Sequence, residues 1–285
     1  MTGNAVLDTL KVATDTLSRT AAKPNDSGWI LHHVMDGKTI DFAPFGEFHI
    51  PQLPTIFGVD ITPTKHVFFM WLSAILLIVI MTIVARGYKK SLIPKKFTNF
   101  FEIMIVFVRD EIAKPTIGHG YEKFTPYLLT AFFFILFGNF LGLIPYSATF
   151  TSNIGVTATL AAFTFIMTQF GGMRQNGVLG YCKGLVPHGI PLWLLPLMIP
   201  VEFLGLLTKP FALAIRLFAN MVAGHTVILA LIGLIFFMKT IFVAPVSIGF
   251  ALFIYLLEIL VALIQAYIFT MLSSLFIGMA VHQDH

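Results

Sequence analysis

Two apolar runs in the C-terminal third constrain the fold of this chain more than any other feature. Residues 192–237 and residues 241–281 are almost continuously apolar. A helix needs roughly 20 mostly apolar residues to cross a lipid bilayer, so each run is about twice the length of one crossing. The runs therefore predict either four short spans or two long helices that are strongly tilted or bent. Three prolines in the first run, Pro196, Pro200 and Pro210, favour bends there.

Three shorter apolar runs complete the pattern. Residues 67–85, 127–144 and 154–170 each have the length of a single crossing. Only 11% of all residues are charged and 57% are hydrophobic, whereas a soluble domain carries about 25% charged residues. We therefore predict an all-α integral membrane protein with about five membrane-crossing helices, of which the last two are long and strongly tilted.

Basic residues set the expected orientation. A cluster follows the first apolar run directly: Arg86, Lys89, Lys90, Lys95 and Lys96. Because lysine and arginine gather on the cytoplasmic side of membrane proteins, this end of the run is expected in the cytoplasm. Residues 97–114 mix charged and large apolar side chains, which is typical of an amphipathic helix on the cytoplasmic surface. Five crossings then leave the C-terminus in the cytoplasm.

The charge pattern divides the chain into two parts. Residues 1–65 are polar and are expected to form an N-terminal extension outside the cytoplasm. Residues 66–285 are expected to form the membrane domain, with residues 191–281 as a hairpin that carries an ion path. The net charge of +4 gives no case for binding nucleic acid.

Ionisable residues within apolar runs are functional candidates, because a charge at the bilayer centre costs about 2.5–3.5 kcal/mol. All of them fall in the last two runs: Glu202, Lys209, Arg216, His225 and Glu258, with Asn220 and Gln265 as polar companions. An arginine stays protonated at every working pH, so Arg216 cannot carry a proton but can attract a carboxylate. The structural alternative is an internal ion pair with Glu202 or Glu258. Lys209 is interpreted as a lysine that extends its ammonium group to the membrane interface.

Helical spacing separates these candidates into two groups. Glu202 precedes Arg216 by 14 residues and returns to nearly the same face, while His225 follows nine residues later on roughly the opposite face. Glu258 is expected near the external surface, as is His225, and it shares a helix face with Gln265. The pattern predicts two polar half-paths that open on opposite sides and are interrupted by Arg216. Ion transfer between them then requires a carrier on another subunit.

The residues around Arg216 resemble a known family. Residues 207–225, LTKPFALAIRLFANMVAGH, are similar to the signature of subunit a of F-type ATP synthases, and residues 257–282 resemble the last helix of that family. Residues 108–118 and 138–157 resemble its earlier segments. The resemblance extends from about Lys65 to the C-terminus.

The resemblance implies a role for each candidate. Arg216 matches the arginine that faces the carboxylate of the rotating ring of c subunits, and Gln265 matches a glutamine close to it. His225 and Glu258 match a pair in the half-channel that opens to the positive side. Glu202 matches an acid in the other half-channel, and Asn220 matches a channel-lining position.

The resemblance also implies the setting. The chain would be a stationary, non-catalytic proton-channel subunit without a cofactor. Its partners would be the ring of c subunits, the b subunits of the peripheral stalk, the rest of the ATP synthase complex and the lipid bilayer. The expected location is a bacterial plasma (inner) membrane, with a mitochondrial inner membrane as the alternative.

Other readings stay open on sequence alone. A secondary transporter or a simple channel would move an ion or solute without partners, and an intramembrane enzyme would use His225 and Glu258 as acid–base or metal groups. Proton and sodium are both conceivable ions, although a histidine in the path favours the proton. Two polar end segments carry the residue types of a metal site: His32, His33 and Asp36, and His282, Asp284 and His285.

Overall fold

The computed structural model describes residues 37, 39–42, 46–49, 62–90, 96–144, 147, 149–184, 194–238 and 241–282. Five helices in these residues are long and apolar enough to cross a membrane, which confirms the predicted fold class. They are α3 (Lys65–Lys90), α6 (Thr125–Leu143), α7 (Ile154–Gly184), α8 (Leu195–Met238) and α9 (Ala244–Val281). An antiparallel hairpin of two short strands, β1 (Thr39–Phe42) and β2 (Gly46–His49), precedes them and was not expected.

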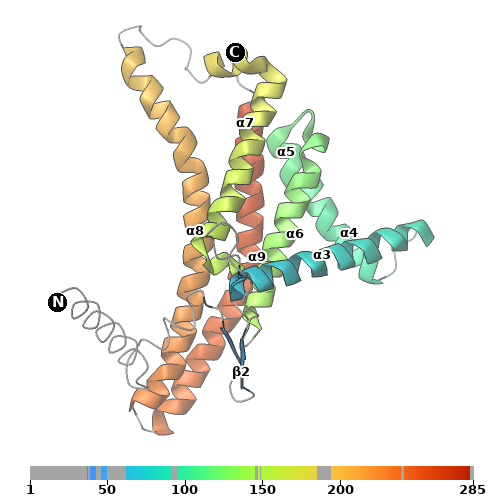
Figure 1. Cartoon of the computed structure of the whole chain (residues 1–285). Coiled ribbons are helices and arrows are strands. Elements are labelled where there is room, and N and C mark those ends of the chain that lie inside the picture. The colour runs from blue at the N-terminus through green and yellow to red at the C-terminus, as the bar shows by residue number, and fades with distance from the viewer. Residues whose placement is uncertain are drawn as a thin grey trace, which may run out of the picture.

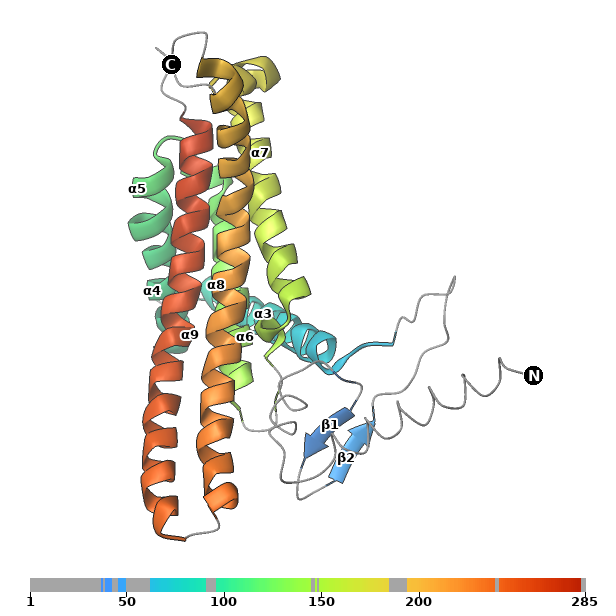
Figure 2. The ribbon, with the colours of Figure 1, turned by 90° about the vertical axis from the view of Figure 1, so that its left-hand side faces the viewer.

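The two overlong runs form two long helices. α8 has 44 residues and α9 has 38, and the short 3-10 helix η5 (Ile241–Val243) precedes α9. They lie side by side as an antiparallel hairpin, while α3 runs across their direction (Figures 1 and 2). At 1.5 Å per residue, α8 is about 66 Å long, more than twice the roughly 30 Å thickness of the hydrocarbon core. If α3 crosses the bilayer directly, the hairpin must lie strongly inclined.

Prolines bend α8 without ending it. Pro200 and Pro210 both lie inside the helix, which curves along its length in Figure 1. Each proline removes one backbone hydrogen bond, and the ring crowds the preceding turn, so a local bend is the expected result.

α7 is longer than the apolar run from which it was predicted. The sequence indicated a span over residues 154–170, but the helix continues through a polar, glycine-containing stretch to Gly184. Gly177 has a positive φ of 71°, which glycine adopts at little cost, and the chain kinks there. Behind the kink the ring of Tyr181 packs so closely on Gly172 that a Cβ there would lie 2.5 Å from it.

The segment predicted as an amphipathic helix is helical in three stretches. They are α4 (Lys96–Val106), the π-helix η1 (Phe107–Ala113) and α5 (Lys114–Ile117). Phe97, Phe100 and Ile103 of α4 are exposed, so its outer face is apolar. The charges gather in η1, where Arg109 Nε donates to Asp110 Oδ1 over 2.8 Å. Hydrogen bonding from this guanidinium lowers the pKa of the Asp110 carboxyl.

Small residues allow α9 to pack closely on the rest of the core. A Cβ at Gly278 would lie 2.2 Å from the backbone oxygen of Thr116 in α5. The hydroxyls of Thr116 and Ser274 meet there over 2.5 Å. Ala262 and Ala266 are fully buried one helical turn apart. Such small side chains bring helix backbones together in membrane proteins, and the contact fixes the position of the polar residues of α9.

Candidate functional site

Arg216 lies on an exposed, apolar stretch of α8. Its side chain is exposed, and so are Ile215 next to it and Ala212 and Ala219 about one helical turn away. Among the residues that the structure describes, neither Glu202 nor Glu258 forms an ion pair with Arg216. The structural alternative of an internal ion pair is therefore not formed. An isolated charge is costly in lipid, so a guanidinium on an apolar face would be stabilised by an anionic group from another molecule.

A hydrogen bond between the two long helices lies next to Arg216. Asn220, one helical turn after Arg216, donates through Nδ2 to Oε1 of Gln265 over 2.8 Å. Gln265 is only 1% exposed. The bond satisfies a buried carboxamide oxygen and fixes the register between α8 and α9 at the level of the arginine.

His225 and Glu258 form a second polar group. Nε2 of His225 lies 3.6 Å from Oε1 of Glu258, which is 4% exposed, while His225 is partly exposed. Gly224 makes the approach possible, because a Cβ there would lie 2.7 Å from Oε1. The structure thus brings together two residues that lie far apart in sequence, as their expected depth in the membrane had suggested.

The turn between α6 and α7 adds a residue that the sequence did not reveal. Oγ1 of Thr149 lies 2.8 Å from Nε2 of His225, and Thr149 is buried. It directly precedes the 3-10 helix η3 (Phe150–Ser152). Next to it, Thr151 donates to Oδ1 of Asn139 over 2.9 Å. Gly138 and Gly142 lie one helical turn apart on α6 and make room for this turn, but nothing in the local sequence indicates that its hydroxyl contacts His225.

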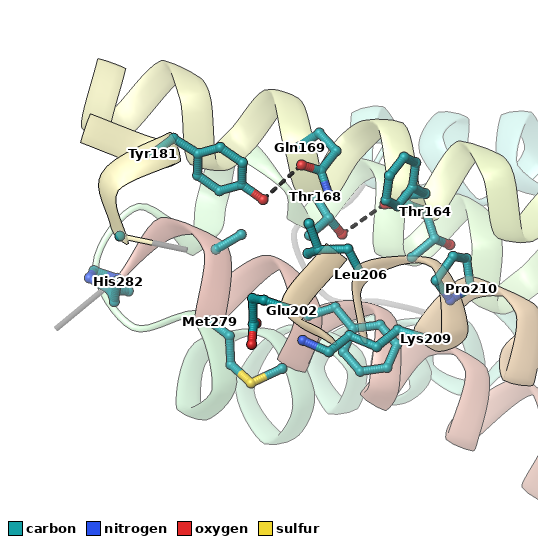
Figure 3. A pocket seen from close by; sticks show the side chains of 14 residues that line it. Thr164, Thr168, Gln169, Tyr181, Glu202, Leu206, Lys209, Pro210, Met279 and His282 are labelled. Atoms are coloured by element: carbon teal, nitrogen blue, oxygen red, sulfur yellow. Dashed lines mark hydrogen bonds between the residues drawn. The ribbon is translucent and has the colours of Figure 1, made fainter. Parts of the chain in front are cut away.

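A pocket of about 330 Å³ surrounds Glu202. Figure 3 shows Glu202 and Lys209 reaching into it from α8, opposite Thr164, Thr168 and Gln169 of α7. Tyr181 donates to Oε1 of Gln169 over 2.7 Å. The lining is thus rich in hydroxyl, amide and charged groups, which water can solvate.

Lys209 also lines this pocket, two helical turns after Glu202 on α8. The expectation that its ammonium group extends to the membrane interface stays a prediction. Its Nζ lies 5.7 Å from the centre of the Phe276 ring, within the range of a cation–π contact.

The pocket and the His225–Glu258 pair lie on either side of Arg216 along α8. With 1.5 Å per residue, Glu202 is about 21 Å before Arg216 and His225 about 13 Å after it.

Of the residues considered for metal sites, His282 lines the pocket around Glu202. The others, His32, His33, Asp36, Asp284 and His285, lie outside the described residues.

Fold and site together define a multi-pass α-helical membrane protein whose last two helices carry polar and ionisable groups at three levels. The chain matches the family model of the ATP synthase A chain over residues 67–278, and so it belongs to the family of ATP synthase a subunits, components of the Fo membrane sector. This confirms the resemblance seen in the sequence.

Relatives of known name agree. The chain is 56% identical over 260 residues to "ATP synthase subunit a" of Chloroherpeton thalassium, covering 90% of this chain and 77% of that protein. It is 52% identical over 281 residues to "ATP synthase subunit a 2" of Chlorobaculum tepidum, covering 96% and 78%. A match to "ATP synthase subunit a" of an Anaeromyxobacter species has 49% identity over 293 residues, covering 90% and 71%. These bacterial relatives and the five apolar helices support a multi-pass protein of a bacterial membrane.

Proposed function

We propose that this chain is the stationary proton-channel subunit of a rotary ATP synthase. It passes protons through two offset half-channels to and from the carboxylates of a ring of c subunits. The observation that carries the proposal is the position of Arg216. It is exposed and without an ion pair among the described residues, between the Glu202 pocket and the His225–Glu258 pair.

The His225–Glu258 pair suits the half-channel from the positive side. An imidazolium Nε2–H can pass its proton to Oε1 of Glu258 once the 3.6 Å gap closes to hydrogen-bond distance. The N–H bond breaks and an O–H bond forms, which leaves a neutral imidazole and a carboxylic acid. Glu258 can then protonate a ring carboxylate. A neutral carboxyl group enters lipid at far lower cost than a charged one, so the ring can turn.

Arg216 separates the two half-channels electrostatically. Its guanidinium attracts an arriving ring carboxylate and favours its ionised form, so the proton leaves there. Arginine does not give up its own proton, so protons cannot hop past it. The Asn220–Gln265 hydrogen bond holds two neutral amides beside it. No carboxylate of this chain neutralises Arg216 within the described residues, which leaves it available to the ring.

The Glu202 pocket suits the half-channel toward the cytoplasm. Its carboxylate and the polar lining from α7 can accept the released proton and pass it to water. A potential of 100 mV contributes about 2.3 kcal/mol for each charge that crosses the membrane. The chain itself would be non-catalytic, its b-subunit and c-ring partners completing the complex in a bacterial plasma (inner) membrane.

The test uses inside-out membrane vesicles that carry the whole complex. ATP is added, and acidification is followed with a pH-quenched dye for wild type and for Arg216→Ala. We expect wild type to acidify the lumen and the variant to fail, while both hydrolyse ATP. Arg174→Ala is the matched control, because Arg174 is an exposed arginine on α7. Acidification by Arg216→Ala at the wild-type rate would contradict the proposal.

The rival transporter and channel readings are tested with the purified chain alone in liposomes. Under the proposal, the chain without its ring moves no ion at a rate comparable to the complex. Rapid ion or solute flux through the isolated chain would favour the rivals.

A further inference from the structure

We propose that Thr149 is the positioning residue of the His225–Glu258 pair, an inference that rests on the proposed function. Its hydroxyl holds the imidazole in place whether Nε2 carries a proton or not. The role belongs to the turn between α6 and α7, not to the two long helices that carry the other candidate residues.

One ring nitrogen has two partners at different distances. Nε2 of His225 lies 2.8 Å from Oγ1 of Thr149 and 3.6 Å from Oε1 of Glu258. At rest the hydroxyl therefore forms the hydrogen bond and the carboxylate lies just beyond hydrogen-bond range. A small rotation of the imidazole exchanges one partner for the other.

A hydroxyl suits both states of the imidazole. It donates to Nε2 when that nitrogen is deprotonated and accepts from it when it is protonated, simply by turning its O–H bond. After His225 has given its proton to Glu258, the Thr149 hydroxyl donates to the freed lone pair. The polar ring atom is then satisfied before and after the transfer, which limits the cost of burying it.

The surrounding structure fixes the hydroxyl. A Cβ at Gly142 would lie 1.8 Å from Oγ1 of Thr149, and a Cβ at Gly138 would lie 2.2 Å from the ring of Phe150. The backbone oxygen of Thr149 accepts from Oγ of Ser152 over 2.6 Å. Thr149 itself is 3% exposed. The two glycines of α6 thus make room for the turn, and the turn presents its hydroxyl to α8.

The ionisable side chains near Nε2 of His225 determine how a change at Thr149 affects proton transfer. Oε1 of Glu258 on α9 is an ionisable partner 3.6 Å from Nε2, and the polar side chains of η3, Thr151 and Ser152, are neutral hydroxyls. Changing Thr149 therefore alters the protonation path through His225 and leaves the carboxylate in place.

The test compares Thr149→Val with Thr149→Ser in inside-out vesicles of the whole complex, over a range of pH. Valine keeps the shape without a hydroxyl, and serine keeps the hydroxyl. One neutral hydrogen bond changes an equilibrium by roughly threefold to tenfold, so we expect ATP-driven acidification to slow by about that factor in the valine variant. Its pH profile should shift as well, while the serine variant follows wild type in both. Thr159→Val is the control, because the exposed Thr159 hydroxyl only bonds the Gly155 backbone.

The outcomes separate the two proposals. If Thr149→Val acidifies at the wild-type rate and with the wild-type profile, or if serine fails like valine, the role of Thr149 is overturned while Arg216→Ala still tests the channel. If the valine variant does not assemble, Thr149→Cys replaces it, since its thiol is only a weak hydrogen-bond donor. A cysteine variant identical to wild type in rate and profile would also overturn the inference.

Discussion

Gly224 of α8 stands directly against the buried carboxylate of Glu258 on α9, where an added Cβ would lie 2.7 Å from Oε1 and 3.0 Å from Cδ. A glycine at this position thus leaves the space in which the carboxylate of Glu258 meets His225, the residue that follows Gly224 in sequence. This relationship makes the residue before the histidine part of the site, although it has no polar side chain.

Gly224→Ala should therefore impair proton transfer without removing any polar group. The new methyl group pushes the Glu258 carboxylate away from Nε2, and a displacement near 1 Å costs up to about a hundredfold in rate when groups must align. We expect ATP-driven acidification to fall by at least tenfold. Glu258→Asp in the same chain should recover part of the loss, because its side chain is one methylene shorter. Gly249→Ala is the control, since nothing lies within 4 Å of a Cβ there; an equal loss in both single variants would argue against steric displacement.

The Asn220–Gln265 bond should behave as a coupled pair. Asn220→Leu leaves Oε1 of the 1% exposed Gln265 without its donor, and a buried unsatisfied polar group costs about 1–3 kcal/mol. We expect a lower thermal midpoint of the detergent-solubilised complex in each single leucine variant. The double variant Asn220→Leu/Gln265→Leu should lose less stability than the two singles together, because no amide is then left unpaired. Strict additivity would show that the bond does not couple the two side chains.

Gly278→Ala should destabilise the packing of α9 on α5. An alanine normally stabilises a helix by roughly 0.5–1 kcal/mol relative to glycine. Here its Cβ would meet the backbone oxygen of Thr116 at 2.2 Å, and overpacking of this kind costs about 1–3 kcal/mol. The overlap involves the backbone, which gives way less easily than a side chain. The destabilisation from overpacking should therefore exceed the gain in helix propensity. The measurement is the amount of this subunit retained in membranes after heating; unchanged retention would contradict the expectation.

The helices were predictable from the sequence because a segment that crosses lipid must be apolar along its whole length. The two overlong runs became α8 and α9, each unbroken, and Arg216 lies in the middle of the first. The third helix was predicted too short, because residues 171–184 are polar and rich in glycine although they are helical. Its continuation depends on packing around Tyr181 and on the kink at Gly177, which no local pattern reveals.

The candidate residues of the site were identified by their charge, whereas Thr149, which the sequence did not reveal, is neutral. Glu202, Arg216, His225 and Glu258 are conspicuous because ionisable groups are rare in apolar runs. Thr149 is one hydroxyl among many in its turn, and only the contact with Nε2 distinguishes it. Lys209 is equally compatible with an interface and with a pocket until the place of Glu202 two turns earlier is known. Contacts between distant segments decide both cases.

Exchanging the acid and the base tests whether the His225–Glu258 pair acts as one unit. Each side chain contacts the other across 3.6 Å, so His225→Glu alone places two carboxylates together, and Glu258→His alone places two imidazoles together. Two adjacent carboxylates repel when both are ionised, and two adjacent imidazoles repel when both are protonated, so either single variant changes which protonation states the pair can adopt. We expect each single variant to lose most ATP-driven acidification.

The double variant His225→Glu/Glu258→His restores one acid and one base at the same two positions. Because Gly224 leaves space beside position 258 and Thr149 can hydrogen-bond a carboxylate as well as an imidazole, the exchanged pair should fit. We expect acidification to recover above the level of both single variants, measured in the same vesicles with ATP hydrolysis as the reference. A double variant no better than the worse single one would mean that the two residues act separately, with Glu258 reaching the ring by a route that does not pass through position 225.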